Sequence, residues 1–232
     1  MKTLFPSAYF GPVEYWAAWI QSEKPVLEVH ENYRKQSYRS RACIATGNGI
    51  LPLNIPVRHT GNASTGRMKM EQAATSVEFR WAREHFRSLE TAYRTSPYFE
   101  FYEDMFRELY FGDVSSLLDF NIRAHKLVCR LLGIDDHVEI TPAYEGSPAD
   151  TADLRMAFSP KTIPATRFEP YTQVFVTKHG FLPNLSILDL LFCCGGRDAL
   201  EYLKNVELII PLEHIVKTIT GKHTNIEFYL RH

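Results

Sequence analysis

The sequence predicts an α/β fold: a single domain with a mixed, partly parallel sheet flanked by helices. Two observations predict it. Short apolar segments with strand character lie both before and after a long stretch of helical periodicity. A parallel strand pair needs a long crossover connection, and helices usually provide it. We therefore expect the early and late strands to share one sheet, in one domain over residues 1–232.

The N-terminal part of the chain begins with a short apolar piece, which a helix follows. That helix is expected from Val13 to Ile20, with Pro12 at its first position. Strands are expected at 25–30, 41–45 and 50–57. The turn at 46–49 (Thr-Gly-Asn-Gly) joins the last two strands as a hairpin.

The middle of the chain carries three apolar stripes at helical spacing. The first runs from Trp81 to Tyr93, the second starts just after Pro97, and the third ends at Gly133. Aromatic side chains at this spacing indicate core packing more often than ligand stacking. Before these helices, the polar, glycine-containing segment 59–67 is expected to be a mobile loop.

The last third of the chain is predicted to mix strands with loops. Strands are expected at 138–142 and 171–177, with a proline-containing loop region between them. A helix opens at Ser186 and ends at the Gly195–Gly196 pair, and a further short helix follows to Leu203. The tail, 206–232, alternates apolar and polar residues and could add a strand at each end.

Composition limits the classes of function. The chain has 232 residues, of which 45% are hydrophobic and 23% charged, and its formal net charge is −1. A net charge so close to zero gives no global field for nucleic acid or an anionic membrane. No apolar run is long enough to span a bilayer, and the first residues show no signal-peptide pattern. We expect a cytoplasmic protein without membrane insertion, and the sequence leaves homo-oligomerisation open.

The cysteines and common motifs predict neither a metal nor a cofactor. None of the four cysteines forms a Cys-x-x-Cys pair, so free thiols in apolar surroundings are expected. The sequence also lacks a P-loop, a Gly-x-Gly-x-x-Gly fingerprint, a Gly-x-Ser-x-Gly elbow and a His-Glu-x-x-His motif. Catalysis is therefore left open, and any enzyme of this sequence is expected to be metal-independent.

The polar segment 31–41 is the strongest candidate for a ligand site. As a strand it places Glu31, Lys35, Arg39 and Arg41 on one face, and as a helix it still groups the first three. Arg and Lys side chains bind phosphate or carboxylate strongly. We expect these three cations to bind an anion, with Glu31 or His30 as general base. The alternative is a solvated edge strand whose charges prevent aggregation.

Two further sites are predicted. Tyr9 and Gly11 precede the first helix, where backbone N–H groups could bind the same anion; an ordinary strand-to-helix turn is the alternative. Tyr171 and Gln173 share one face of an expected strand and could hydrogen-bond a sugar or an amide. For the remaining polar side chains in apolar surroundings, structural roles are favoured: His85, Asn121, Asp153, Arg155, Asn184, Ser186 and Asp189.

Five motifs in order resemble the WbqC-like protein family. They are Pro6-x-x-Tyr9-x-x-Pro12, Lys35 followed by Arg39 and Arg41, Ile55-Pro56-Val57, Ala92-Tyr93 followed by Ser96-Pro97-Tyr98-Phe99, and the segment from Asn184 to Phe192. The resemblance covers about residues 6–203 and leaves 206–232 as a C-terminal extension. Many members have Gln-Pro where this chain has Phe5-Pro6, and a Tyr-Ile-Asn segment that is absent here.

The resemblance implies a setting in bacterial surface polysaccharide biosynthesis, such as O-antigen. It also implies a transferase that moves an acyl or aminoacyl (glycine) group to an amino sugar, with a nucleotide-linked sugar as the small-molecule ligand. Two alternatives stay open. One is a non-catalytic protein that binds an anionic or nucleotide-linked ligand. The other is a partner subunit of a biosynthetic complex, with the aromatic helices as its interface.

Overall fold

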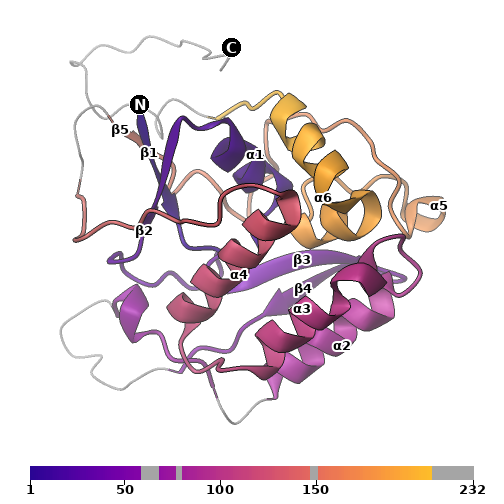
Figure 1. The fold of residues 1–232 in the computed structure, drawn as a ribbon, viewed down its shortest axis with the longest axis horizontal. Coiled ribbons are helices and arrows are strands. Elements are labelled where there is room, and N and C mark those ends of the chain that lie inside the picture. Colours follow the sequence, from indigo (N-terminus) through magenta and orange to yellow (C-terminus); the bar gives the residue numbers. More distant parts are fainter. Residues whose placement is uncertain (59–67, 77–79, 147–150, 211–232) are drawn as a thin grey trace.

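The computed structural model describes residues 1–58, 68–76, 80–146 and 151–210 (Figure 1). The fold is α/β, as predicted: a parallel three-stranded sheet, a small antiparallel sheet, and helices packed around both. The expected loop at 59–67 and the tail from 211 onward lie outside the described residues.

The parallel sheet has the strand order β2-β1-β5. The strands are β1 (Lys2–Pro6), β2 (Lys24–Glu28) and β5 (Thr151–Asp153). In the register, Leu4 of β1 faces Val26 on one side and Asp153 on the other. Because all three strands run the same way, their carboxyl ends meet at one edge. Ligands of open α/β sheets commonly bind at that edge.

The predicted hairpin is confirmed as an antiparallel pair, β3 (Arg41–Thr46) and β4 (Gly49–Asn54). Gly49 has a φ of 101°, a conformation that side chains with a Cβ rarely adopt, and the Thr46 hydroxyl donates to its carbonyl at 2.8 Å. The second strand is shorter than expected, because the chain leaves the ladder after Asn54; Val57 forms only an isolated bridge, with Thr75.

The predicted helices are confirmed. They are α1 (Val13–Gln21), α2 (Trp81–Tyr93), α3 (Phe99–Phe111), α4 (Leu117–Leu132) and α6 (Ile187–Asn205), with short elements η1 (Met70–Gln72) and α5 (Val176–His179) between them. Gly133, at a φ of 71°, caps α4. The predicted break at Gly195–Gly196 is confirmed: α6 consists of two helices that meet at a kink, where Gly195 has a non-helical backbone with a φ of 77°.

Two strand predictions are wrong. Residues 138–142 contribute only an isolated bridge between Ile140 and Leu27. Residues 171–177 form no strand, because the Gln173 side chain bonds the backbone of Leu182 and the chain then turns into α5. The late strand of the sheet is Thr151–Asp153 instead, and residues 206–210 form no strand.

Aromatic side chains fill the core between the sheets and the helices. Tyr9, Trp81, Phe106, Tyr110 and Phe120 are all buried there and make edge-on or tilted ring contacts with neighbouring rings. Figure 1 shows α2 and α3 side by side on one flank, and α1 next to α6 on another. This packing supports the structural interpretation of most of the aromatic stripes.

Replacing Gly196 with alanine should destabilise the fold. A Cβ at Gly196 would lie 1.7 Å from the carbonyl oxygen of Leu131, so α4 and α6 would have to separate. We expect the free energy of unfolding to fall by about 1–3 kcal/mol or more, because extra atoms forced into a well-packed core typically cost that much. Gly47→Ala is the control in the same denaturation experiment, because its Cβ would meet only Phe175, at 3.8 Å. Equal effects of the two changes would contradict the close helix contact.

Candidate functional site

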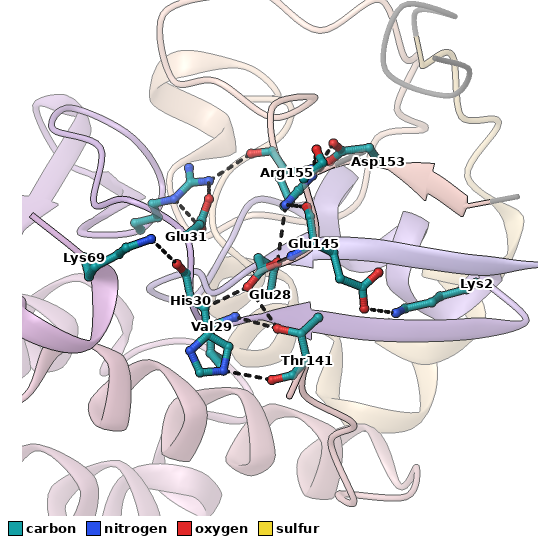
Figure 2. Close-up of polar contacts among 12 residues, drawn as sticks. Lys2, Glu28, Val29, His30, Glu31, Lys69, Thr141, Glu145, Asp153 and Arg155 are labelled. Carbon is teal, nitrogen blue, oxygen red and sulfur yellow. Dashed lines mark hydrogen bonds and ion pairs between the residues drawn. The ribbon is translucent and has the colours of Figure 1, made fainter. Parts of the chain in front are cut away.

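A fully buried carboxylate, that of Glu28, organises the carboxyl edge of the parallel sheet (Figure 2). Its Oε1 accepts from the backbone N–H of His30 at 2.8 Å and from the Thr141 hydroxyl at 2.9 Å. Its Oε2 accepts from the backbone N–H of Glu145 at 3.0 Å and from Arg155 Nη1 at 3.3 Å. Glu28 is the last residue of β2, so one side chain joins the end of a strand to loops more than 100 residues away.

His30 stands at this edge with its side chain 33% exposed. Its Nε2 lies 3.1 Å from the carbonyl oxygen of Thr141. A carbonyl oxygen only accepts, so Nε2 carries the hydrogen of that bond. Its Nδ1 lies 3.6 Å from Glu71 Oε2 of η1, and Lys69 Nζ donates to the His30 carbonyl at 3.3 Å. The His30 imidazole is therefore partly exposed, with Nε2 held by the Thr141 backbone and Nδ1 facing Glu71.

Glu31 and Arg39 form a buried ion pair rather than an open anion site. Arg39 Nε and Nη2 donate to the two carboxylate oxygens at 2.7 and 2.5 Å, and the side chains are only 7% and 3% exposed. Burial raises the pKa of the Glu31 carboxyl, and the Arg39 charge opposes that rise. Because both oxygens are occupied, Glu31 is poorly placed to take a proton from a ligand.

The shared face predicted for segment 31–41 is not formed. The segment is a succession of turns rather than a strand or a helix, with Gln36 at a φ of 54°. Lys35 is exposed on this turn, and Arg41 Nε donates to the Asn54 side chain at 2.7 Å, at the hairpin. The turn brings Arg39 back to Glu31, whereas Lys35 is exposed and Arg41 bonds the hairpin instead.

A second buried guanidinium, that of Arg155, completes the edge. It binds Asp153 with Nε at 2.8 Å and Nη2 at 2.6 Å, and its Nη1 donates to the Glu145 carbonyl at 2.6 Å. Arg155 and Lys69 each lie 5.3 Å from the centre of the Tyr144 ring, and Tyr144 is 52% exposed. A partly open aromatic ring therefore adjoins two cations close to His30.

The residues predicted at the start of the first helix are buried and already bonded. The Tyr9 hydroxyl lies 2.8 Å from His85 Nδ1 and 2.6 Å from the Tyr110 hydroxyl, and burial lowers the pKa of His85 to about 4. The first helical N–H groups, of Val13 and Glu14, donate to Leu185 and Asn184. The carbonyl of Gly11 accepts from Ile187. An anion at this helix start would have to displace these bonds.

Tyr171 and Gln173 come together, although on a loop rather than a strand. Both donate to Asp189 Oδ2, at 2.7 and 2.8 Å, and Tyr93 donates to Oδ1 at 2.8 Å. Asp189 is fully buried, and burial raises its pKa against the effect of these three bonds. This second polar cluster connects α6 to α2 and to the loop before α5. Its hydrogen bonds therefore have a structural role.

The family model for the WbqC-like protein family matches residues 7–162. The chain belongs to the WbqC-like protein family. This WbqC-like protein is also similar to a Mycobacterium tuberculosis (strain ATCC 25618 / H37Rv) protein named "Uncharacterized protein Rv1507c". The two are 26% identical over 202 residues, covering 74% of this chain and 84% of that protein. No solved structure matches this WbqC-like protein.

Sequence reasoning missed most residues around His30 in this WbqC-like protein. Glu28 reads as an ordinary strand residue, and Lys69, Glu71, Thr141 and Tyr144 belong to no motif. They meet only because the parallel sheet brings distant loops to one edge. The one available signal was the end of a strand followed by His30 and Glu31, and these residues lie at the carboxyl edge of the parallel sheet.

Two arrangements are absent from the described part of the chain. Among those residues, no group of three or more His, Cys, Asp or Glu side chains is arranged to hold a metal ion. All four cysteines are free. None of the helices described is both long and apolar enough to cross a membrane.

Removing one member of the buried ion pair should cost much more than removing an exposed one. Arg39→Met leaves the Glu31 carboxylate buried without its partner, and we expect the free energy of unfolding to fall by about 3–5 kcal/mol. Arg130→Met is the control, because Arg130 is 64% exposed and lies 3.7 Å from Asp136; its loss should cost about 0–1 kcal/mol. Chemical denaturation measures both. Similar losses would show that the Glu31–Arg39 pair is not desolvated.

Proposed function

We propose that this WbqC-like protein binds a small, polar, anionic ligand at the carboxyl edge of its parallel sheet and transfers an acyl or aminoacyl group to an amine of that ligand. The observation that carries the proposal is His30: partly exposed, oriented by the Thr141 carbonyl, and next to Lys69, whose ammonium group lies over the Tyr144 ring. An amino sugar on a nucleotide carrier, as the family resemblance implies, is the ligand class that matches these features.

In this proposal His30 is the general base. The amine nitrogen attacks the carbonyl carbon of an activated ester or thioester donor, a C–N bond forms, and the bond to the leaving group breaks. His30 Nδ1 takes the proton from the amine and returns it to the leaving oxygen or sulfur. Such proton transfer typically contributes about 10²–10⁴ in rate. His30 is favoured over Glu31, whose oxygens both accept from Arg39.

Cations and an aromatic ring support the anionic part of the proposal. Lys69 is held beside His30, and Lys35 is exposed on the neighbouring turn. The partly open ring of Tyr144 offers a flat surface for a sugar or a base. Arg39 and Arg155 are buried and paired with carboxylates, so in this proposal they support the site rather than bind ligand directly. This assignment replaces the predicted trio of Lys35, Arg39 and Arg41 with Lys69 and Lys35.

A non-catalytic binding protein is the second candidate, and one observation favours it. Glu71 Oε2 lies 3.6 Å from His30 Nδ1. If the ligand-bound protein keeps His30 protonated, the imidazolium pairs with Glu71 and cannot act as a base. The same site would then bind an anion through Lys69 and His30 together, with no chemistry. Turnover separates the two candidates.

Replacing His30 with glutamine should abolish transfer while leaving ligand binding nearly intact. The expected loss in kcat is about 10²–10⁴, because only proton transfer is removed. Product formation from nucleotide-linked amino sugars and acyl or aminoacyl thioesters is measured by mass spectrometry. His179→Gln is the matched control: His179 Nε2 also contacts backbone carbonyls, of Thr46 and Gly47, but at the hairpin turn. Product from wild type and His30→Gln alike would remove His30 from the mechanism.

Replacing Lys69 with methionine should weaken binding of the anionic ligand. A charge-assisted contact supports an effect of about 10- to 100-fold in Kd for a nucleotide-linked sugar, and the effect should shrink at high salt. Lys178→Met is the control, because Lys178 donates to the Gly47 carbonyl on the hairpin side of the molecule. Isothermal titration calorimetry measures both. Unchanged affinity in Lys69→Met would place the ligand elsewhere.

A further inference from the structure

Glu28 and Thr141 hold His30 from two sides at once. Glu28 Oε1 accepts both the His30 backbone N–H and the Thr141 hydroxyl, and the Thr141 carbonyl accepts from His30 Nε2 (Figure 2). The Thr141 hydroxyl also accepts from the Val29 N–H at 3.4 Å. Backbone and ring of one histidine are thus tied to the same two buried residues, each at most 1% exposed.

We propose that Glu28 and Thr141 are positioning residues that hold His30 in the tautomer with hydrogen on Nε2, so that Nδ1 is the atom that meets the substrate. This inference deepens the proposed function and rests on it. The opposite tautomer would set the Nε2 lone pair against the Thr141 carbonyl oxygen at 3.1 Å. Two acceptors at that distance repel each other, whereas the Nε2–H form makes a hydrogen bond.

The tautomer decides which chemical group the site accepts. In neutral His30, Nδ1 is an acceptor, and Glu71 Oε2 lies 3.6 Å from it as a second acceptor. A group with two or more hydrogens, such as an amine, can donate to both. A carbonyl or carboxylate oxygen would face two acceptors instead. The two acceptor atoms, His30 Nδ1 and Glu71 Oε2, therefore select an amine as the group next to His30. The anionic part of the ligand then lies toward Lys69.

Long-range ¹H–¹⁵N correlation spectra of the ligand-free full chain test the tautomer directly. They are recorded at pH 8, where histidines are ordinarily neutral, and the His30 signals are assigned by their loss in His30→Gln. We expect the Nε2–H tautomer to exceed the Nδ1–H form by more than tenfold. An equal mixture or an excess of Nδ1–H in the wild type overturns the proposal.

Thr141→Val tests the positioning role. It removes the hydroxyl that bridges Glu28 and Val29 but keeps the carbonyl, and we expect the tautomer ratio of His30 to fall at least threefold. Thr141→Ser should restore the wild-type ratio. Thr75→Val is the matched control, since Thr75 is also 1% exposed and donates its hydroxyl to the Val114 carbonyl instead. A ratio in Thr141→Val equal to that in Thr75→Val overturns the positioning role.

The readout needs no turnover, so the two proposals can fail separately. A fixed Nε2–H tautomer in a protein that transfers no group from any donor would contradict the transferase and leave the positioning of His30 standing. An active protein with the Nδ1–H tautomer would contradict the positioning and proton uptake at Nδ1, but it would leave the transferase activity itself standing.

Discussion

The arrangement of this WbqC-like protein depends on one buried carboxylate at the end of a central strand. An ionised Glu28 without partners would be very costly in the interior. Four donors, from His30, Thr141, Glu145 and Arg155, surround it. Because these donors come from three separate segments of the chain, their hydrogen bonds to the Glu28 carboxylate also fix the positions of those segments. The edge of the sheet is thereby built before any ligand arrives.

A second buried pair stiffens the other side of His30. Glu31 is clamped by Arg39, and the Arg39 carbonyl in turn accepts from the Asn121 side chain of α4 at 2.8 Å. The Glu31 carbonyl accepts from the Met70 N–H of η1 at 2.8 Å. In sequence, His30 therefore lies between two residues that are held in place by buried contacts, Glu28 and Glu31. Precise placement of a base on a loop requires support of this kind.

The sequence predicts the fold well and the site partly, for physical reasons. Helices with long apolar stripes, such as α2 and α4, and the hairpin turn with Gly49 follow from local periodicity and turn chemistry. The strand Thr151–Asp153 and the pairing of Arg39 with Glu31 do not, because a three-residue strand and a contact across a turn are set by tertiary packing. Charge in segment 31–41 predicts a face of open cations, whereas in the structure Arg39 is buried against Glu31.

Amide hydrogen exchange in Glu28→Gln, compared with wild type, tests most directly whether this carboxylate organises the edge. The account predicts that the amides of His30 and Glu145, which donate to Glu28, lose protection selectively. The amide of Leu27 donates to the Glu139 carbonyl and should keep its protection. Full retention at His30 and Glu145, or an equal loss at all three amides, would contradict the central role of Glu28.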